Sequence, residues 1–304
     1  MASPTQITPN QLARLVGTPD CPTLIDVRID EDFAQDPRML PSARRHAFGD
    51  MAGLAPMVAA SAQAAPSPAG SMPAKSKVVI YCQKGFKISQ GAAAMLRALG
   101  VDAQTLEGGH LAWRDAGLPM VDGAKLPQAD RSGATLWVTR HRPKIDRIAC
   151  PWLIRRFIDP LAQFLFVDPS QVRAVAERFG ATPFDMDGVF WSHRDERCNF
   201  DTVLEETGLR SAPLERLARI VRGADTGRLD LAPEAAGLMA ASLGLSRMYR
   251  DDLQQLEAGL LLYDAFYRWA RDATDETHDW PHAAPTNGAR NDAPPAARPR
   301  RSAP

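Results

Sequence analysis

The sequence predicts an α/β domain over residues 5–122, followed by a mainly α-helical (α+β) domain with a small sheet over residues 135–272. The first prediction rests on Thr23–Val27 and Val78–Tyr81, which are apolar runs of the kind found in strands buried inside a parallel sheet. The second rests on a series of helical patterns, several of which end at glycine. Between them, residues 123–134 are polar and contain Gly and Pro, which predicts a linker.

Composition supports two domains and narrows the function classes. The chain has 304 residues, and 36 Lys and Arg balance 36 Asp and Glu, which argues against a general nucleic-acid binder. The sequence has no apolar stretch of about 18 residues and no signal-peptide pattern, so no membrane partner is expected. Four scattered cysteines predict a reducing, cytoplasmic location. Residues 274–304 have almost no large apolar side chains and are expected to be disordered.

The remaining elements follow from periodicity and from helix start and stop signals. In the first domain we expect helices over Gln11–Val16 and Ser89–Leu99, and a strand over Asp102–Leu106. In the second, the expected strands are Leu136–Thr139, Phe164–Val167 and Val189–Ser192. Five helices are expected there: one capped by Ser170 and ending at Gly180, one capped by Asn199 and ending at Gly208, and three more over Pro213–Arg222, Pro233–Leu243 and Asp251–Arg271.

The most informative chemical motif is the loop Cys82–Lys87, which lies between a buried strand and a helix. We expect successive backbone N–H groups of this loop to point toward the sulfur of Cys82, with the positive end of the helix behind them. This predicted anion cradle consists of Gln83, Lys84, Gly85, Phe86 and Lys87. Such surroundings stabilise a thiolate and predict a nucleophile. The alternative is a small cysteine packed at a strand end.

The loop resembles the active-site loop of rhodanese-type sulfurtransferases. Three further segments resemble motifs of that family in the same order: Leu24–Arg28, the segment from Pro41 to His46, and the segment from Glu107 to Pro119. The resemblance implies a five-stranded parallel sheet with helices on both faces. It also implies that Cys82 carries persulfide sulfur from a sulfane-sulfur donor to a thiol acceptor, with no cofactor required.

One position departs from the family pattern. The family usually ends the loop with Arg, whereas this chain has Lys87, which keeps the charge but loses the bidentate fork. Related phosphatases use a loop that is one residue longer and closed by Arg, but the next residue here is Ile88, so sulfur chemistry is favoured. Asp26 and Arg28 are expected to form structural hydrogen bonds at the end of their strand.

Residues 137–160 are the most basic segment, with six cationic residues against two carboxylates, or +4. Pro151 fits the first position of a helix, with Cys150 as its cap, so the thiol would lie at a positive helix end. The candidate oxyanion-binding residues are Arg140, Lys144, Arg147, Cys150, Arg155 and Arg156. The alternative is a packed cysteine with a solvated basic face.

A second group of ligand-type side chains lies between Phe190 and Asp201. His193 and Cys198 can supply nitrogen and sulfur ligands to a metal ion, although their spacing matches no standard zinc pattern. The alternative is a network of arginines and carboxylates that holds the loop.

The second domain resembles the chromate-resistance protein ChrB family. The residues that carry the resemblance are Trp137–Arg140, Arg142–Arg156, Ser192–Arg194 with Cys198, Arg222–Asp225 and Gly244–Arg247. The resemblance implies a role in bacterial chromate resistance, with some members proposed to sense chromate and control an efflux gene. Clustered guanidinium groups suit a divalent tetrahedral oxyanion such as chromate or sulfate.

Two functional hypotheses follow. The first is a sulfurtransferase fused to an oxyanion-responsive domain and serving chromate resistance. The second is a chromate-sensing regulator or binding protein in which the first domain is a non-catalytic sensor or docking module. DNA is a partner only under the second hypothesis, and it is not favoured because the chain has zero net charge and no recognisable helix-turn-helix pattern.

Overall fold

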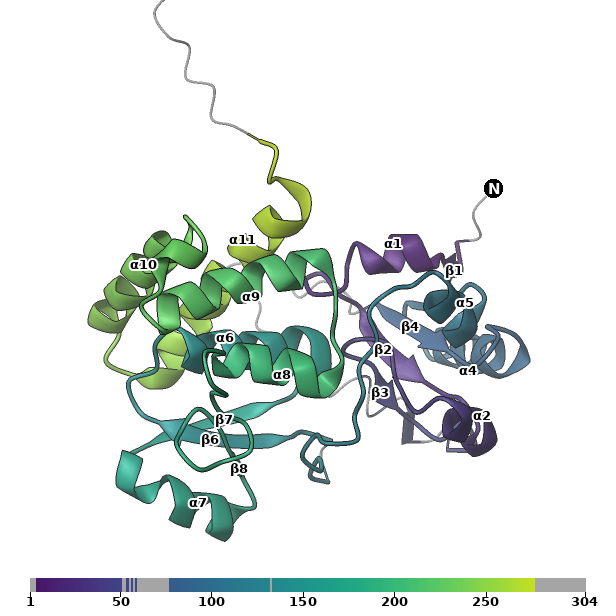
Figure 1. Cartoon of the computed structure of the whole chain (residues 1–304). Coiled ribbons are helices and arrows are strands. Elements are labelled where there is room, and N and C mark those ends of the chain that lie inside the picture. The colour runs from purple at the N-terminus through teal and green to yellow at the C-terminus, as the bar shows by residue number, and fades with distance from the viewer. Residues whose placement is uncertain are drawn as a thin grey trace, which may run out of the picture.

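The protein is described by a computed structural model that covers residues 4–50, 53, 54, 56, 58, 77–131 and 133–276. Figure 1 shows two sheets at different places in the molecule, the first in purple and blue and the second in teal, with green and yellow helices packed over the second. The tail predicted to be disordered falls almost entirely on residues 277–304, which lie outside the described residues.

The first sheet has five strands, and every pairing is parallel. The strands are β1 (Gln6–Ile7), β2 (Thr23–Asp26), β3 (Arg44–Arg45), β4 (Val78–Tyr81) and β5 (Ala103–Leu106), in the order β1-β5-β4-β2-β3. The helices of this domain are α1 (Pro9–Ala13), α2 (Asp30–Gln35), α4 (Lys87–Ala98) and α5 (Gly109–Asp115). The predicted five-stranded parallel sheet is therefore confirmed.

Successive side chains of the central strands point to opposite faces of the sheet, and both faces are buried. Ile25 and Ile80 belong to one apolar cluster, which also contains buried residues of α4. Leu24 and Val79 belong to another, which contains Leu12 of α1 and also residues of α5. Helices thus cover both faces, which is why these two strands are apolar along their whole length.

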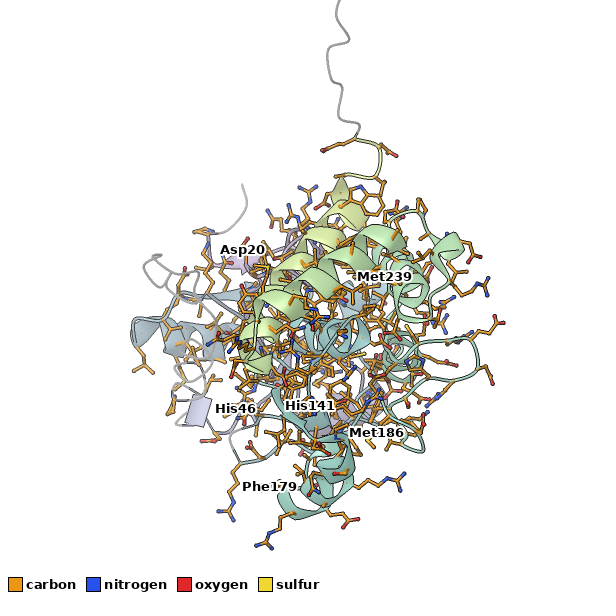
Figure 2. All side chains as sticks on the ribbon, turned by 90° about the vertical axis from the view of Figure 1, so that its left-hand side faces the viewer. Asp20, His46, His141, Phe179, Met186 and Met239 are labelled. Atoms are coloured by element: carbon orange, nitrogen blue, oxygen red, sulfur yellow. The ribbon has the colours of Figure 1, made fainter. Side chains whose placement is uncertain are left out.

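The second domain contains a three-stranded parallel sheet, ordered β7-β6-β8, and a layer of helices. The strands are β6 (Leu136–Arg140), β7 (Gln163–Val167) and β8 (Thr182–Pro183). The helices are α6 (Asp146–Leu153), η1 (Ile154–Ile158), η2 (Pro169–Gln171), α7 (Val172–Phe179), α8 (Asn199–Thr207), α9 (Ala212–Asp225), η3 (Leu229–Leu231), α10 (Ala235–Met248) and α11 (Asp252–Asp272). Figure 2, which labels Met239 of α10 and Phe179 of α7, shows α10 and α11 facing the viewer and α7 below them.

Several local predictions for this domain are wrong. The cap positions of η2 and α8 are held by Asp168 and Cys198, not by Ser170 and Asn199. Val189–Ser192 is not a strand, since it contributes only an isolated bridge between Trp191 and Phe184, and the third strand is the short β8. Helix α6 begins at Asp146, so Pro151 lies inside it and Cys150 is not its cap. Every residue from Ile148 to Leu153 is buried, so tertiary packing outweighs the usual preference of proline for a first turn.

The two domains share one apolar core. The cluster that contains Leu12 and Trp113 of the first domain continues into Phe157 and Tyr267 of the second. The predicted linker is also packed rather than free, since Leu126 lies against this cluster. Within the described residues, no helix is long and apolar enough to cross a membrane.

Candidate functional site

Cys82 lies directly after β4 and is 5% exposed. Its Sγ lies 3.2 Å from the hydroxyl oxygen of Ser89 in α4, a neighbour that the sequence reasoning did not identify. Within the described part of the chain, the backbone N–H groups of residues 83–87 donate no hydrogen bond, either to Sγ or to any other atom. The sulfur cradle therefore stays a prediction, but these donors have no competing acceptor among the residues that the structure describes.

The Cys82 loop is held by the closing motif of the first domain. The backbone N–H groups of His110 and Leu111, in the first turn of α5, donate to the carbonyl oxygens of Cys82 and Gln83 at 3.0 and 3.1 Å. Gly85 has φ +72°, and a Cβ there would lie 2.7 Å from the carbonyl oxygen of Leu106. Two motifs that are separated in the sequence thus form one tightly packed unit.

The side chains of the loop differ in exposure. Lys84, Phe86 and Lys87 are exposed, with Phe86 at 64%, and Lys87 is the first residue of α4. Gln83 is half-buried, and its Oε1 is buried without a hydrogen-bond partner. The loop therefore presents two cations at the surface beside a buried thiol.

Asp26 and Arg28 form a fully buried ion pair, with Nη2 of Arg28 2.6 Å from Oδ2 of Asp26. The same guanidinium donates to the carbonyl oxygens of Asp36 and Arg38 at 2.7 and 3.0 Å. These contacts fix the segment after β2 to the edge of the sheet, which is a structural role.

The structure divides the six candidate oxyanion-binding residues among separate places. Arg140 and Arg147 lie beside Asp185, with nitrogen–oxygen distances of 3.4 and 3.2 Å, and Lys144 is exposed. Arg155 and Arg156 line a different pocket, described below.

Cys150 differs from its prediction. It lies inside α6 and is fully buried, with its Sγ 3.9 Å from Oδ1 of Asp146. Burial, and then the adjacent carboxylate of Asp146, raise the pKa of the Cys150 thiol well above its usual value. This residue is therefore a packed, protonated thiol at neutral pH rather than an activated one.

A pocket of about 510 Å³ lies at the junction of the two domains. Cys21 and Arg44 line it from the first domain, and Arg155 and Arg156 line it from the second. Both second-domain arginines are already paired, Arg155 with Glu257 at 2.6 Å and Arg156 with Asp264 at 2.8 Å. An anion entering this pocket would meet three guanidinium groups whose charges are partly balanced.

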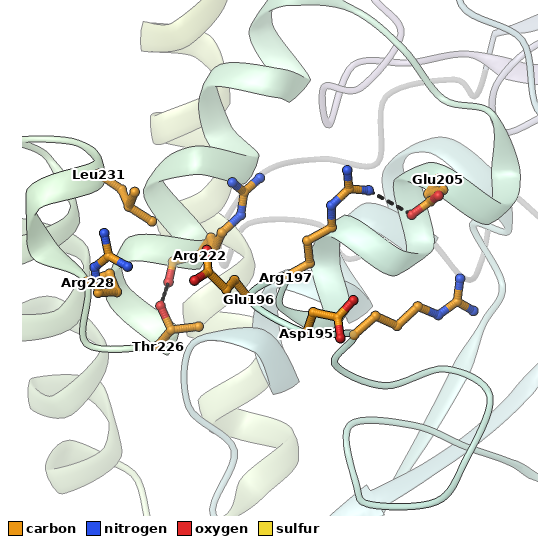
Figure 3. A pocket seen from close by; sticks show the side chains of 9 residues that line it. Asp195, Glu196, Arg197, Glu205, Arg222, Thr226, Arg228 and Leu231 are labelled. Atoms are coloured by element: carbon orange, nitrogen blue, oxygen red, sulfur yellow. Dashed lines mark hydrogen bonds and ion pairs between the residues drawn. The ribbon is translucent and has the colours of Figure 1, made fainter.

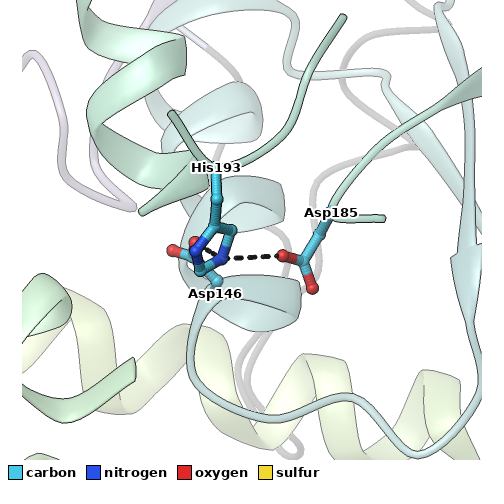
Figure 4. Close-up of side chains that lie close together, drawn as sticks. All are labelled: Asp146, Asp185 and His193. Atoms are coloured by element: carbon cyan, nitrogen blue, oxygen red, sulfur yellow. Dashed lines mark ion pairs between the residues drawn. The ribbon is translucent and has the colours of Figure 1, made fainter. Parts of the chain in front are cut away.

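A third group of side chains surrounds His193 (Figure 4). Its Nε2 lies 3.4 Å from Oδ2 of Asp146, 3.2 Å from Oδ1 of Asp185 and 3.2 Å from Oδ2 of Asp225. Asp146 begins α6, Asp225 ends α9, and Asp185 and His193 lie in the segment between β8 and α8. We call these four residues the His193 cluster.

The carboxylates of the His193 cluster are crowded and mostly buried. The carboxylates of Asp146, Asp185 and Asp225 raise the pKa of His193 well above its usual value. Burial, and then the charge of Asp225, raise the pKa of Asp146. Each of two carboxylates is oriented by neighbours: Asp146 accepts the backbone N–H of Asn199 at 2.5 Å, and Asp185 contacts Arg140 and Arg147 as described above.

Cys198, which the sequence paired with His193, is not part of the cluster. It caps α8, with its Sγ 3.4 Å from Oδ2 of Asp201. Arg222 in turn holds Asp201 with two hydrogen bonds of 2.7 and 2.8 Å. The alternative prediction, an arginine–carboxylate network, thus describes the surroundings of Cys198. Sequence reasoning missed Asp185 entirely, and it gave Asp146 and Asp225 no ligand role although both lie in segments that carry the family resemblance.

A charged pocket of about 700 Å³ is lined in part by residues that follow members of the His193 cluster in the sequence (Figure 3). Arg194 and Thr226, which directly follow His193 and Asp225, are among its lining residues. Figure 3 shows another lining residue, Arg197, paired with Glu205, at 2.9 Å. None of the candidate oxyanion-binding residues lines this pocket.

Comparisons with known proteins agree with the two-part architecture. Residues 8–116 match the family model of the Rhodanese-like domain, and residues 137–270 match that of the ChrB C-terminal domain. Protein ChrB of Cupriavidus metallidurans is 34% identical over 172 residues, which are 52% of this chain and 51% of that protein. The chain thus matches about half the length of this curated relative.

Two solved structures are each similar to part of the chain. A rhodanese-related protein from Thermoplasma volcanium is 18% identical, with a TM-score of 0.29, and the match covers 38% of this chain and 96% of that one. A thiosulfate sulfurtransferase from Pseudomonas aeruginosa is 26% identical, with a TM-score of 0.29, covering 40% and 20%. The fold is assigned from the strand order and the family matches. Residues 8–116 are thus similar to a rhodanese-like domain, and residues 137–270 to a ChrB C-terminal domain.

Proposed function

We propose that this is a cytoplasmic chromate-resistance protein whose rhodanese-like domain transfers sulfur through Cys82. The observation that carries the proposal is the loop after Cys82, whose five backbone N–H groups have no acceptor among the described residues, while α5 holds the carbonyl oxygens of Cys82 and Gln83. Such donors can stabilise an anionic sulfur bound one atom beyond Sγ. Lys84 and Lys87 add positive charge at the mouth of the loop.

The proposed reaction has two steps. The Cys82 thiolate attacks the sulfane sulfur of a donor such as thiosulfate, which forms an S–S bond and releases sulfite with the electron pair of the broken bond. An acceptor thiolate then attacks the outer sulfur of the Cys82 persulfide. The acceptor leaves as a persulfide, and the Cys82 thiolate is regenerated.

Sulfur transfer from thiosulfate to cyanide tests the proposal. We expect Cys82→Ser to lose all transfer, because a hydroxyl cannot carry sulfane sulfur, while Cys21→Ser keeps the wild-type rate. Mass spectrometry should find one added sulfur atom on Cys82 after thiosulfate treatment. Equal transfer by wild type and Cys82→Ser would exclude the assignment.

A second candidate function, binding of a tetrahedral oxyanion, is favoured by the pocket at the domain junction. Arg44, Arg155 and Arg156 line it together. Guanidinium forks match the oxygens of chromate or sulfate, and a hydrogen bond to a charged group contributes about 1.5–3 kcal/mol. An oxyanion there would contact both domains, which is how a sensor could couple them.

Titration of the full chain with chromate at fixed salt, with sulfate as competitor, tests this second candidate. We expect saturable binding that sulfate displaces, and that weakens about tenfold or more in Arg155→Gln. The control is Arg173→Gln, an exposed arginine of α7. Unchanged affinity in Arg155→Gln would exclude the pocket. Salt-dependent binding of a DNA duplex instead would support the regulator hypothesis.

A further inference from the structure

The His193 cluster has the composition of a metal-binding site. One ligand atom each from Asp146, Asp185 and His193 can be chosen so that all three lie within 4.8 Å of one another. The side chains of Asp146 and Asp185 are 1% and 7% exposed, whereas that of His193 is 39% exposed. The site thus combines two nearly buried carboxylates with a partly exposed histidine.

The distances within the cluster favour a shared ion over hydrogen bonds. An imidazole carries at most one hydrogen on Nε2, so that atom can donate to only one of the three carboxylates. Nε2 lies 3.4 Å from the oxygen of Asp146 and 3.2 Å from that of Asp185, longer than the roughly 2.9 Å usual for N–H···O. Ligands bound at about 2.1 Å in a tetrahedral site are separated by about 3.4 Å.

The ligand side chains are oriented by other groups, as in established metal sites. Oδ2 of Asp146 accepts the N–H of Asn199 at 2.5 Å, and its Oδ1 accepts that of Phe200 at 3.2 Å, at the start of α8. Nε of Arg147 lies 3.2 Å from Oδ2 of Asp185, which leaves the other oxygen of Asp185 facing His193. Both carboxylates are thus fixed before any ion arrives.

A buried amide next to the cluster also lacks a hydrogen-bond partner for its oxygen. Asn199 is fully buried, and its Oδ1 has no hydrogen-bond partner among the described residues. Its Nδ2 lies 3.4 Å from Sγ of Cys150, and that sulfur lies 3.9 Å from Oδ1 of Asp146, so the amide is beside the cluster. A buried acceptor without a donor is costly unless a cation or a bound water satisfies it.

We propose that Asp146, Asp185 and His193 bind a divalent transition-metal ion, with Asp225 at the edge of the site. An imidazole together with carboxylates suits Zn²⁺, Fe²⁺ or Mn²⁺ better than Mg²⁺ or Ca²⁺, which prefer oxygen ligands alone. Asp225 can accept a hydrogen bond from a water on the ion.

Metal content of the full chain tests the proposal. Protein stripped with EDTA, reloaded with Zn²⁺ and desalted should retain about one ion per chain, and Mn²⁺ should bind while Mg²⁺ binds more weakly. We expect His193→Ala and Asp185→Asn each to weaken Zn²⁺ binding by about a hundredfold or more. The matched control is His141→Ala, which removes an exposed histidine 3.9 Å from Asp168 in the same domain.

Two further variants separate the alternatives. Cys198→Ser should keep full affinity, and the Co²⁺-loaded protein should show no thiolate charge-transfer band, because no sulfur is a ligand. Cys82→Ser should also keep full affinity, so failure of sulfur transfer and failure of metal binding are independent. Circular dichroism should show that the His193→Ala variant is folded. Full affinity in His193→Ala, or no binding of Zn²⁺ or Mn²⁺ by the wild type, would overturn the proposal and leave a protonated His193 as the cation of the cluster.

Discussion

The backbone N–H of Ser42 in the first domain donates a hydrogen bond to the carbonyl oxygen of Phe157 in the second, over 2.6 Å. Ser42 has φ +61°, a left-handed conformation that non-glycine residues rarely adopt, so the segment before β3 is held in an uncommon shape where the domains meet. The ring of Phe157 belongs to the core that both domains share. The fold of one domain is therefore tied to that of the other.

Substitution of Gly17 tests this junction. Gly17 has φ +77°, and a Cβ there would lie 2.3 Å from the ring of Phe157. We expect Gly17→Ala to lower the free energy of unfolding by about 1–3 kcal/mol, through overpacking and backbone strain. Gly237→Ala is the control, since a Cβ at that position of α10 meets nothing within 4 Å. Thermal unfolding should show one transition in the wild type, and an unchanged midpoint in Gly17→Ala would contradict a packed junction.

Gly85 should be needed for sulfur transfer. A Cβ at Gly85 would lie 2.7 Å from the carbonyl oxygen of Leu106 and 2.8 Å from the backbone nitrogen of Gly109, so Gly85→Ala must displace the loop. We expect at least a tenfold loss in kcat for thiosulfate, because displaced amides no longer face the sulfur. Gly91→Ala, on the open side of α4, should keep the wild-type rate. Equal rates for both variants would show that the loop shape is irrelevant to the reaction.

The buried pair of Asp26 and Arg28 should be a large contributor to stability. Both side chains are fully buried, so Arg28→Ala leaves an uncompensated carboxylate, at a cost of about 3–5 kcal/mol. Arg114→Ala removes the arginine of an exposed pair with Asp115 and should change stability by less than about 1 kcal/mol. Urea unfolding measures both variants, and similar losses would contradict the difference in burial.

His110 should make stability depend on pH. Burial, and then the charge of Arg28, lower the pKa of His110 below its usual value. The unfolded chain therefore binds a proton more readily, so this contribution is complete above about pH 6.5 and is lost as the pH falls through the folded pKa, by at most about 1.4 kcal/mol per pH unit. Urea midpoints at pH 7.5 and 5.5 should differ less in His110→Gln than in the wild type. His141 is exposed, and its replacement in His141→Gln should leave the difference between the two urea midpoints as it is in the wild type.

The thiol of Cys21, in the pocket at the domain junction, should react slowly with alkylating reagents. Burial raises the pKa of Cys21 to about 11, so about one molecule in a thousand carries the thiolate at pH 8. In Cys82→Ser protein, alkylation of Cys21 by iodoacetamide should rise about tenfold per pH unit from 8 to 10. Peptide mass spectrometry measures the rate of Cys21 alkylation. An alkylation rate that levels off below pH 9 would contradict the raised pKa.

The sequence by itself determined the parts that depend on local chemistry. The runs around Leu24 and Val79 are apolar on both faces, which requires a sheet covered on both sides, and the loop after Cys82 has a length and a glycine that specify its turn. Helix ends at Gly180 and Gly208 could be placed because both adopt a positive φ that other residues avoid. These features involve neighbouring residues, so their signals are continuous in the chain.

Only the tertiary structure decided which distant side chains meet. Asp146, Asp225 and the segment that holds Asp185 and His193 are far apart in the sequence, and nothing in their spacing shows that three carboxylates share one imidazole. The start of α6 was likewise set by burial of the whole helix, which overrode the local preference of Pro151. Contacts between distant segments depend on how helices pack over the sheets. That packing minimises exposed apolar area over the whole molecule, so no short stretch of sequence records it.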